Sequence, residues 1–248
     1  MSGSAISAKD AVIRYGDLLA VDGVGLDVAP GEFVALVGPS GCGKTSILAA
    51  LAGHIKLSSG FVERSGAARM VYQQDGLLPW MTVRENIMLA LKNIRSKPER
   101  EERLSEMLEL TDLKEFAKSF PHELSGGMRQ RAELARALAG DCSVLLLDEP
   151  FSSLDCLTRI RLRHELAVIL EKMPRAVLMV THDVPEAVQL ADRIILLSER
   201  PAQVVMEIKM NKPRPRELTD ESVVGAVSQI LTKLGLTGNH PALMGGAQ

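Results

Sequence analysis

Four short apolar segments constrain the fold of this 248-residue chain more than any other feature. They cover residues 33–37, 144–147, 176–180 and 194–197. Continuous apolar runs of this length indicate strands that are buried on both faces. Helical patterns at residues 44–52 and 156–173 lie between them. This alternation predicts an α/β fold with a mostly parallel sheet.

Two further regions depart from that alternation. Residues 11–15 and 25–28 predict short strands in an antiparallel β part at the N-terminus. A capping box, Thr82-Val83-Arg84-Glu85, and leucines spaced among charges at residues 100–118 predict helices. We expect one domain over residues 1–217 with a helical subdomain inserted at about 76–140. Residues 218–248 are expected to form a short tail that includes a helix over 221–234.

The loop after the first apolar segment carries a phosphate-binding pattern. Its sequence, GPSGCGKT, fits G-x-x-x-x-G-K-[ST] and stands between an expected strand and an expected helix, as the pattern requires. Glycines let backbone N–H groups close around phosphate oxygens, and the helix N-terminus adds partial positive charge. We expect Lys44 to reach the β- and γ-phosphates and Thr45 to bind Mg²⁺. A Gly-rich turn without a ligand is the alternative. The expected nucleotide-binding residues here are Gly38, Pro39, Ser40, Gly41, Cys42, Gly43, Lys44, Thr45 and Ser46.

Two carboxylates follow the apolar segment at residues 144–147. Asp148 comes directly after the segment and is positioned to hold Mg²⁺. Glu149 comes next, points elsewhere and is free to polarise a water molecule as a general base. Two solvated acids at a strand end are the alternative. Beside the phosphate loop, however, the pair favours hydrolysis of a γ-phosphate.

Composition narrows the classes of partner. The net charge is −2, the isoelectric point is near 6.2 and aromatic residues make up only 3% of the chain. These values do not favour binding to nucleic acid. No apolar run approaches the roughly 20 residues that span a bilayer. Three cysteines without metal-type spacing indicate free thiols in a reducing compartment.

Taken together, the motifs resemble those of the ATP-binding subunit of an ABC transporter. They are GPSGCGKT, Gln73, LSGGMRQR at residues 124–131, LLLDEP, SSLD and THD, in one order in one chain. The resemblance covers residues 6 to 210. LSGG is the most distinctive motif, because other P-loop ATPases lack it. The resemblance implies the ABC ATPase fold, with ATP and Mg²⁺ as cofactors.

The resemblance also implies that LSGG closes over ATP held by a second subunit. Ser125 would donate to a γ-phosphate oxygen, while Gly126 and Gly127 bring N–H groups close, ahead of a helix expected to start near Met128. Ser125 as a helix N-cap is a compatible local role. The match implies a role for four further residues. Tyr15 would stack on adenine, and Gln73 would sense Mg²⁺ and the attacking water. Asp155 would lie in a loop that crosses the dimer interface, and His182 would contact the γ-phosphate.

Segment 76–83, with the only tryptophan, narrows the resemblance to importers. Trp80 is either a core anchor of the helical insert or part of a groove that receives a helix of the membrane subunit. The LLPW sequence of this segment is similar to that of importers for nitrate, sulfonates and taurine. Those importers often have a Gly-Ala pair where this chain has Ser152-Ser153. Cys42 is either a small filler or a reactive thiol.

The resemblance implies the motor of an import system for a small anion. Its partners would be a second copy or a similar ATPase subunit, integral membrane permease subunits and, indirectly, a periplasmic or surface solute-binding protein. The chain would then lie at the cytoplasmic side of the cell membrane as a peripheral protein. The alternatives are a soluble ABC ATPase without a membrane partner and a nucleotide-dependent scaffold with degenerate chemistry.

Overall fold

A six-stranded sheet forms the centre of the molecule, for which the computed structural model describes residues 3–72, 76–214 and 216–236. Its strand order is β5-β6-β7-β3-β8-β9. All neighbours pair in parallel except β8 and β9, which are antiparallel. This confirms the predicted α/β fold with a mostly parallel sheet. The strands are β3 (Phe33–Val37), β5 (Ala68–Val71), β6 (Val144–Asp148), β7 (Ala176–Thr181), β8 (Arg193–Leu197) and β9 (Val204–Lys209).

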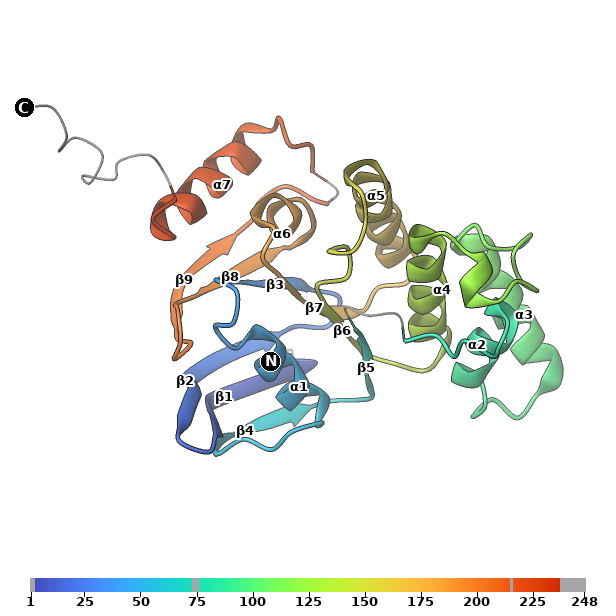
Figure 1. Cartoon of the computed structure of the whole chain (residues 1–248), viewed down its shortest axis with the longest axis horizontal. Coiled ribbons are helices and arrows are strands. Elements are labelled where there is room, and N and C mark those ends of the chain that lie inside the picture. Colours follow the sequence, from blue (N-terminus) through green and yellow to red (C-terminus); the bar gives the residue numbers. More distant parts are fainter. Residues whose placement is uncertain (1–2, 73–75, 215, 237–248) are drawn as a thin grey trace, which may run out of the picture.

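A second, antiparallel sheet covers one face of the central sheet together with helix α1 (Lys44–Ala52) (Figure 1). It has the order β2-β1-β4, with β1 at Ile6–Tyr15, β2 at Leu18–Val28 and β4 at Ser59–Arg64. Val34 and Leu36 point to this face, while Phe33, Ala35 and Val37 point to the opposite one. That alternation follows from the two-residue period of a strand.

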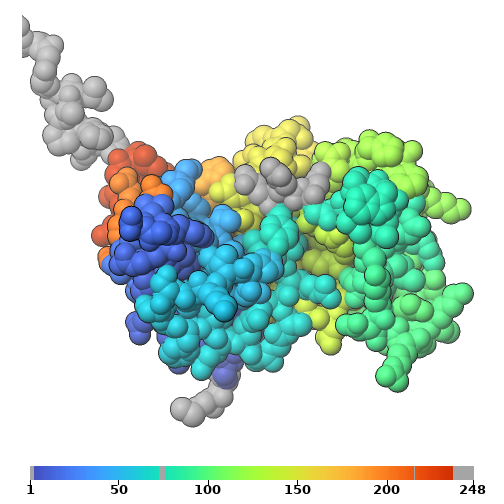
Figure 2. Space-filling view, turned by 60° about the horizontal axis from the view of Figure 1, so that its bottom comes forward, coloured from blue at the N-terminus to red at the C-terminus, as the bar shows by residue number. Residues whose placement is uncertain are grey.

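Helices cover the opposite face, where their apolar side chains form the larger core cluster. They are α2 (Val83–Ala90), α3 (Lys97–Leu110), α4 (Gly126–Ala139), α5 (Cys156–Lys172), α6 (Val184–Leu190) and α7 (Glu221–Lys233). Helices α2, α3 and α4 gather at one end of the molecule (Figure 1). In Figure 2 this green end and the blue N-terminal strands lie on opposite sides of the surface.

The structure differs from the sequence prediction in several elements. Helix α3 ends at Leu110 rather than near residue 118, because Thr111 bonds back to the Met107 carbonyl at 2.7 Å and Asp112 adopts a φ of 54°. Side chains such as Thr and Asp compete for local backbone groups and so favour helix ends. Helix α4 begins at Gly126, two residues earlier than predicted. Strands β4 and β5 and helix α6 were not predicted.

Neither a membrane-spanning helix nor a disulfide is found within the described ranges. No helix there combines the length and apolar character that crossing a bilayer demands. The longest helix in the described part of the chain, α5, has 17 residues and carries several charges. All three cysteines are free thiols, with Cys42 and Cys142 buried and Cys156 exposed.

Candidate nucleotide site

A loop at residues 38–43 joins strand β3 to helix α1 and is the predicted phosphate cradle. Gly43 has a φ of 120°, which side chains rarely allow. A Cβ atom on Gly43 would also lie 3.0 Å from Val21 Cγ2 and 3.1 Å from the Ala20 carbonyl oxygen. No acidic side chain stands in the first turn of α1 and no side chain caps it. Its first N–H groups therefore remain available to an anion.

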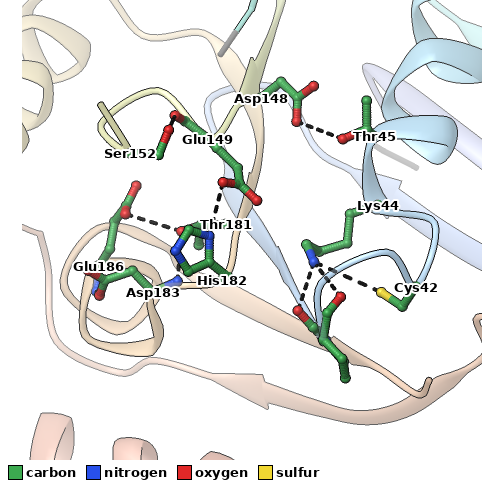
Figure 3. A network of polar contacts seen from close by, with 12 residues as sticks. Cys42, Lys44, Thr45, Asp148, Glu149, Ser152, Thr181, His182, Asp183 and Glu186 are labelled. Carbon is green, nitrogen blue, oxygen red and sulfur yellow. Dashed lines mark hydrogen bonds and ion pairs between the residues drawn. The ribbon is translucent and has the colours of Figure 1, made fainter. Parts of the chain in front are cut away.

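Lys44 lies buried beneath this loop with 5% of its surface exposed. Its Nζ donates to the carbonyl oxygens of Gly38 at 2.7 Å and Pro39 at 2.8 Å. The same atom lies 4.0 Å from Cys42 Sγ, and Figure 3 shows the three contacts converging on the ammonium group. A buried ammonium needs such acceptors, since an unpaired charge is costly away from water.

Thr45 and Asp148 meet beside the cradle, where α1 begins and β6 ends (Figure 3). Thr45 Oγ1 donates to Asp148 Oδ1 at 3.1 Å. Burial raises the pKa of Asp148, and the hydrogen bond from Thr45 opposes that shift. Hydroxyl and carboxylate oxygens are the ligands that Mg²⁺ takes from a protein when phosphates supply others. No cluster of three or more His, Cys, Asp or Glu that could hold a metal ion occurs among the described residues.

Glu149 and His182 face one another across the ends of β6 and β7 (Figure 3). His182 Nδ1 lies 2.9 Å from Glu149 Oε2, with 53% of the histidine side chain exposed. Glu149 has a φ of 46°, an uncommon backbone state for a residue with a side chain. The Glu149 N–H donates to the Val180 carbonyl at 2.9 Å, and its own carbonyl accepts the Ser152 N–H at 3.1 Å. Such strain costs about 1–3 kcal/mol and persists where the surroundings hold it.

Tyr15 lies at the end of β1, beside the helix that follows the cradle. Its side chain is half exposed, and its hydroxyl donates to Ser46 Oγ at 3.1 Å. An exposed ring next to a phosphate loop can stack on a planar base. Ser40 and Gly41 are exposed at the loop tip, whereas Cys42 is 2% exposed. The buried position of Cys42 favours the small-filler interpretation of its thiol over the reactive one.

The LSGG segment lies apart from this group. Ser125 is the exposed N-cap of α4 and accepts from the Met128 N–H at 3.3 Å, and Gly126 begins the helix. A Cβ atom on Gly127 would lie 2.8 Å from Thr158 Cγ2, so the glycine permits close packing against α5. Helix α4 belongs to the core cluster on the opposite face of the sheet from α1.

The structure gives a different outcome for each of the three remaining predicted residues, Asp155, Gln73 and Trp80. Asp155 caps α5, its Oδ1 accepting from the N–H groups of Leu157 and Thr158 at 3.1 Å each. Gln73 lies outside the described residues. Of the two interpretations of Trp80, the core anchor is wrong, because the residue is 69% exposed. The groove for a membrane subunit stays a prediction.

The charged residues that contact Thr181 and Asp183, the neighbours of His182, were not identified from the sequence. Arg163 and Glu186 are buried, and both contact groups next to the histidine. Arg163 lies on helix α5 and Glu186 on helix α6. The sequence did contain a signal for helix α6: Asp183 precedes Val184-Pro185-Glu186, an N-cap followed by an early proline.

Comparisons with known proteins agree with this geometry. Residues 21–152 match the ABC transporter family. The taurine import ATP-binding protein of Rhizobium johnstonii is 44% identical over 80% of this chain and 79% of its own. An aliphatic sulfonates import ATP-binding protein of Rhodococcus jostii is 40% identical over 89% of each chain. A dimeric ATP-binding cassette in a post-hydrolysis state bound to ADP and Pi superposes with a TM-score of 0.72 at 30% identity, over 84% of this chain and 99% of that one. The chain belongs to the ABC transporter family as an ATP-binding, ATP-hydrolysing protein.

Proposed function

We propose that this ATPase is the motor of an import system for a small anion and works as two copies arranged head to tail. The taurine and sulfonate importers among its relatives support the substrate class. The dimeric cassette among its structural neighbours supports the pairing. The separation of LSGG from the cradle supports it as well, because LSGG must then meet a nucleotide held by another copy.

Lys44 and the N-terminus of α1 bind the triphosphate in this proposal. The Lys44 ammonium exchanges its two carbonyl acceptors, on Gly38 and Pro39, for β- and γ-phosphate oxygens. Tyr15 stacks on the adenine ring. Thr45 and Asp148 hold Mg²⁺, which neutralises charge on the phosphates when it is bound.

Glu149 then accepts a proton from the water that attacks the γ-phosphorus. The water oxygen forms the new bond to phosphorus as the bond to the ADP oxygen breaks, so phosphate and ADP result. His182 fixes the Glu149 carboxylate through the 2.9 Å contact and faces the γ-phosphate. This contact, beside the pair of Thr45 and Asp148, is the observation that carries the proposed chemistry. Gln73 is proposed to sense the metal and the water.

The second copy completes the site from the other side. Ser125 of the partner subunit donates to a γ-phosphate oxygen, and the first N–H groups of its helix α4 add partial positive charge. The Asp155 loop crosses the interface. Nucleotide therefore favours the closed pair, and loss of phosphate charge after hydrolysis releases it.

The membrane subunits of the import system are proposed to dock near Trp80. Its exposed indole lies just before helix α2 and offers an apolar surface at the helical end of the molecule. The protein would act at the cytoplasmic face of the membrane as a peripheral subunit. A solute-binding protein would select the small anion, such as taurine, another sulfonate or nitrate.

Glu149→Gln tests the proposal, since it keeps the side-chain shape and removes the base. We expect turnover to fall about 10²- to 10⁴-fold while ATP binding persists and an ATP-dependent dimer accumulates. Size-exclusion chromatography with light scattering, with and without ATP and Mg²⁺, measures the dimer. Glu199→Gln, at an exposed glutamate to which the proposal gives no role, is the matched control. Full activity in Glu149→Gln, or a monomer at saturating ATP, would contradict the proposal.

A further inference from the structure

One guanidinium group joins the two loops that flank the hydrolytic residues. Arg159, on the first turns of α5, donates from Nη2 to the Leu154 carbonyl oxygen at 3.1 Å. It donates from Nη1 to Asp183 Oδ2 at 3.2 Å. Leu154 belongs to the Ser152–Asp155 loop, and Asp183 directly follows His182. The planar fork of arginine suits such a bridge, because its two Nη atoms keep a fixed separation.

The Asp183 end of this bridge is held in a fixed position. Asp183 Oδ1 accepts from the Glu186 N–H at 2.9 Å, and Arg163 Nη2 donates to Asp183 Oδ2 at 2.7 Å. Burial opposes ionisation, but the hydrogen bond from Glu186 and the charges of Arg163 and Arg159 hold the pKa of Asp183 below its usual value. Asp183 is therefore a carboxylate at neutral pH and attracts both arginines.

The residue before His182 belongs to the same network (Figure 3). The Asp183 N–H donates to Thr181 Oγ1 at 3.0 Å, and that hydroxyl donates to Glu186 Oε2 at 3.1 Å. Both backbone neighbours of His182 are thus tied to the start of α6. His182 is the exposed member of this group and extends towards Glu149. Because Asp183 is the next residue in the chain, a shift of Asp183 also shifts the backbone of His182.

The Leu154 end of the bridge leads to Glu149. Ser152 Oγ donates to the Glu149 carbonyl oxygen at 3.0 Å, at the start of the loop. Asp155, at the end of the loop, caps α5, from which Arg159 extends. A path therefore runs from Glu149 by a hydrogen bond to Ser152, along the backbone of the loop to Leu154, and by the two hydrogen bonds of Arg159 to Asp183 beside His182.

We infer that Arg159 is a positioning residue that transmits displacement of the Ser152–Asp155 loop to His182, and so sets the contact of His182 with Glu149. The inference rests on the proposed function, in which this loop meets the partner copy. Closing of the pair then aligns the acid and the histidine in the same step. A contiguous chain of hydrogen bonds and backbone can carry coupling of this kind, and Arg159 provides the link between the two loops.

Arg159→Gln and Arg159→Lys test the inference, with Arg161→Gln, exposed on the same helix, as the control. We expect Arg159→Gln to lower kcat for ATP about tenfold, a typical size for coupling between sites. KM for ATP and Tm should match those of Arg161→Gln. Arg159→Lys keeps the charge but offers one nitrogen in place of two, so kcat should stay well below that of wild type. A wild-type kcat in Arg159→Lys would show that the two-nitrogen bridge is not needed, and would overturn the inference.

A double-mutant cycle separates positioning from packing. If Arg159 acts through His182, then Arg159→Gln lowers single-turnover ATP hydrolysis much less in a His182→Ala background than in wild type. Additive losses would overturn the inference. A fall in Tm that accompanies the loss of kcat in both Arg159 variants would assign the residue a structural role and overturn it too.

The same experiments distinguish this inference from the proposed function. If wild type hydrolyses ATP and Glu149→Gln dimerises with ATP, the proposed function holds. Unchanged kcat in Arg159→Gln would then reject the positioning role of Arg159 alone. If neither hydrolysis nor ATP-dependent pairing occurs in wild type, the proposed function itself fails.

Discussion

The phosphate cradle and the LSGG segment are both glycine-containing helix starts, yet they use glycine for different reasons. In the cradle, Gly43 has a φ of 120°, and α1 has no side-chain cap. In LSGG, Gly127 is an ordinary helical residue that makes room for Thr158, and Ser125 caps α4. The first needs a backbone conformation that side chains disfavour, and the second needs only space.

The two helix starts also differ in what surrounds them. Around the cradle, one chain brings together an ammonium, a hydroxyl and two carboxylates, from Lys44, Thr45, Asp148 and Glu149. The α4 helix start packs against α5, in the core cluster on the other face of the sheet. One half of the proposed site is therefore already assembled within a single folded chain. In the proposal, a second copy supplies the other half.

The largest expected effect is on ATP hydrolysis when two variants are mixed, each defective in one half of the proposed site. Lys44→Ala removes the phosphate ligand and Ser125→Glu places a negative charge where the γ-phosphate would lie. Each variant alone should lose turnover by at least about 100-fold, as for loss of a key donor to a developing charge. A mixed pair retains one site with an intact cradle and an intact LSGG.

Steady-state hydrolysis of the two variants, separately and in equal mixture, measures this effect. We expect the mixture to exceed either variant by about tenfold or more, the difference between a lost donor and one intact site. A mixture no more active than its parts would show that the two halves do not come from different copies.

A second prediction concerns Glu186, which supports the His182 loop. Burial raises its pKa from 4.5 to about 7, against the opposing charge of Arg163. The folded chain therefore binds this proton more tightly than the unfolded chain, and its contribution to the free energy of unfolding falls as pH rises from 4.5 to about 7. Ionisation of Glu186 above that range lowers the free energy of unfolding by on the order of 3 kcal/mol, and Glu186→Gln should remove this loss.

Urea unfolding of wild type and Glu186→Gln, measured from about pH 4 to about pH 8 across the titration range of a buried carboxyl, checks this prediction. As pH rises, the free energy of unfolding of wild type should fall relative to that of Glu186→Gln. A pH-independent difference would mean that Glu186 keeps the pKa of an exposed carboxyl.

The third prediction tests Thr45 and Asp148, the proposed metal ligands beside the cradle. Thr45→Val keeps the shape of the side chain and removes the hydroxyl that meets Asp148. We expect the Mg²⁺ concentration for half-maximal hydrolysis to rise about tenfold, comparable to the loss of one good polar contact. Thr219→Val, at an exposed site in the C-terminal part, is the control.

The same Mg²⁺ titration, repeated at several pH values in wild type, tests the environment of Asp148. Burial raises its pKa, and only the ionised carboxylate binds the metal. The Mg²⁺ requirement should therefore increase as pH falls, beginning at a higher pH than for an exposed aspartate. A requirement independent of both Thr45 and pH would exclude this pair as the metal site.

The smallest expected effect tests the packing role of glycine at LSGG. Gly127→Ala would bring Cβ to 2.8 Å from Thr158 Cγ2 and should destabilise the fold by about 1 kcal/mol, as overpacking does. Gly126→Ala meets Leu154 Cδ2 at an ordinary 3.4 Å and serves as the control. Adding Thr158→Ser removes the methyl group and should restore the Tm. An unchanged Tm in Gly127→Ala would show that space is not what the glycine provides.

Elements defined by local hydrogen bonding were predicted well. Helix α1 has the predicted bounds, and the Thr82–Glu85 capping box is present at the start of α2. Strand β5 was missed because it has four residues and only Val71 among them is buried. Helix α3 was predicted too long because the apolar spacing continues past Leu110, where Leu113 is buried although the helix has ended.

By itself, the sequence determined the α/β class, the cradle with its lysine, and the order of the motifs, because these depend on neighbouring residues and on apolar periodicity. Tertiary structure alone decided that Asp183 meets Arg159, 24 residues away, and that Trp80 is exposed. It also decided that LSGG packs on α5, away from the cradle. Such contacts depend on how the sheet and helices stack, and no local pattern in the sequence records that arrangement.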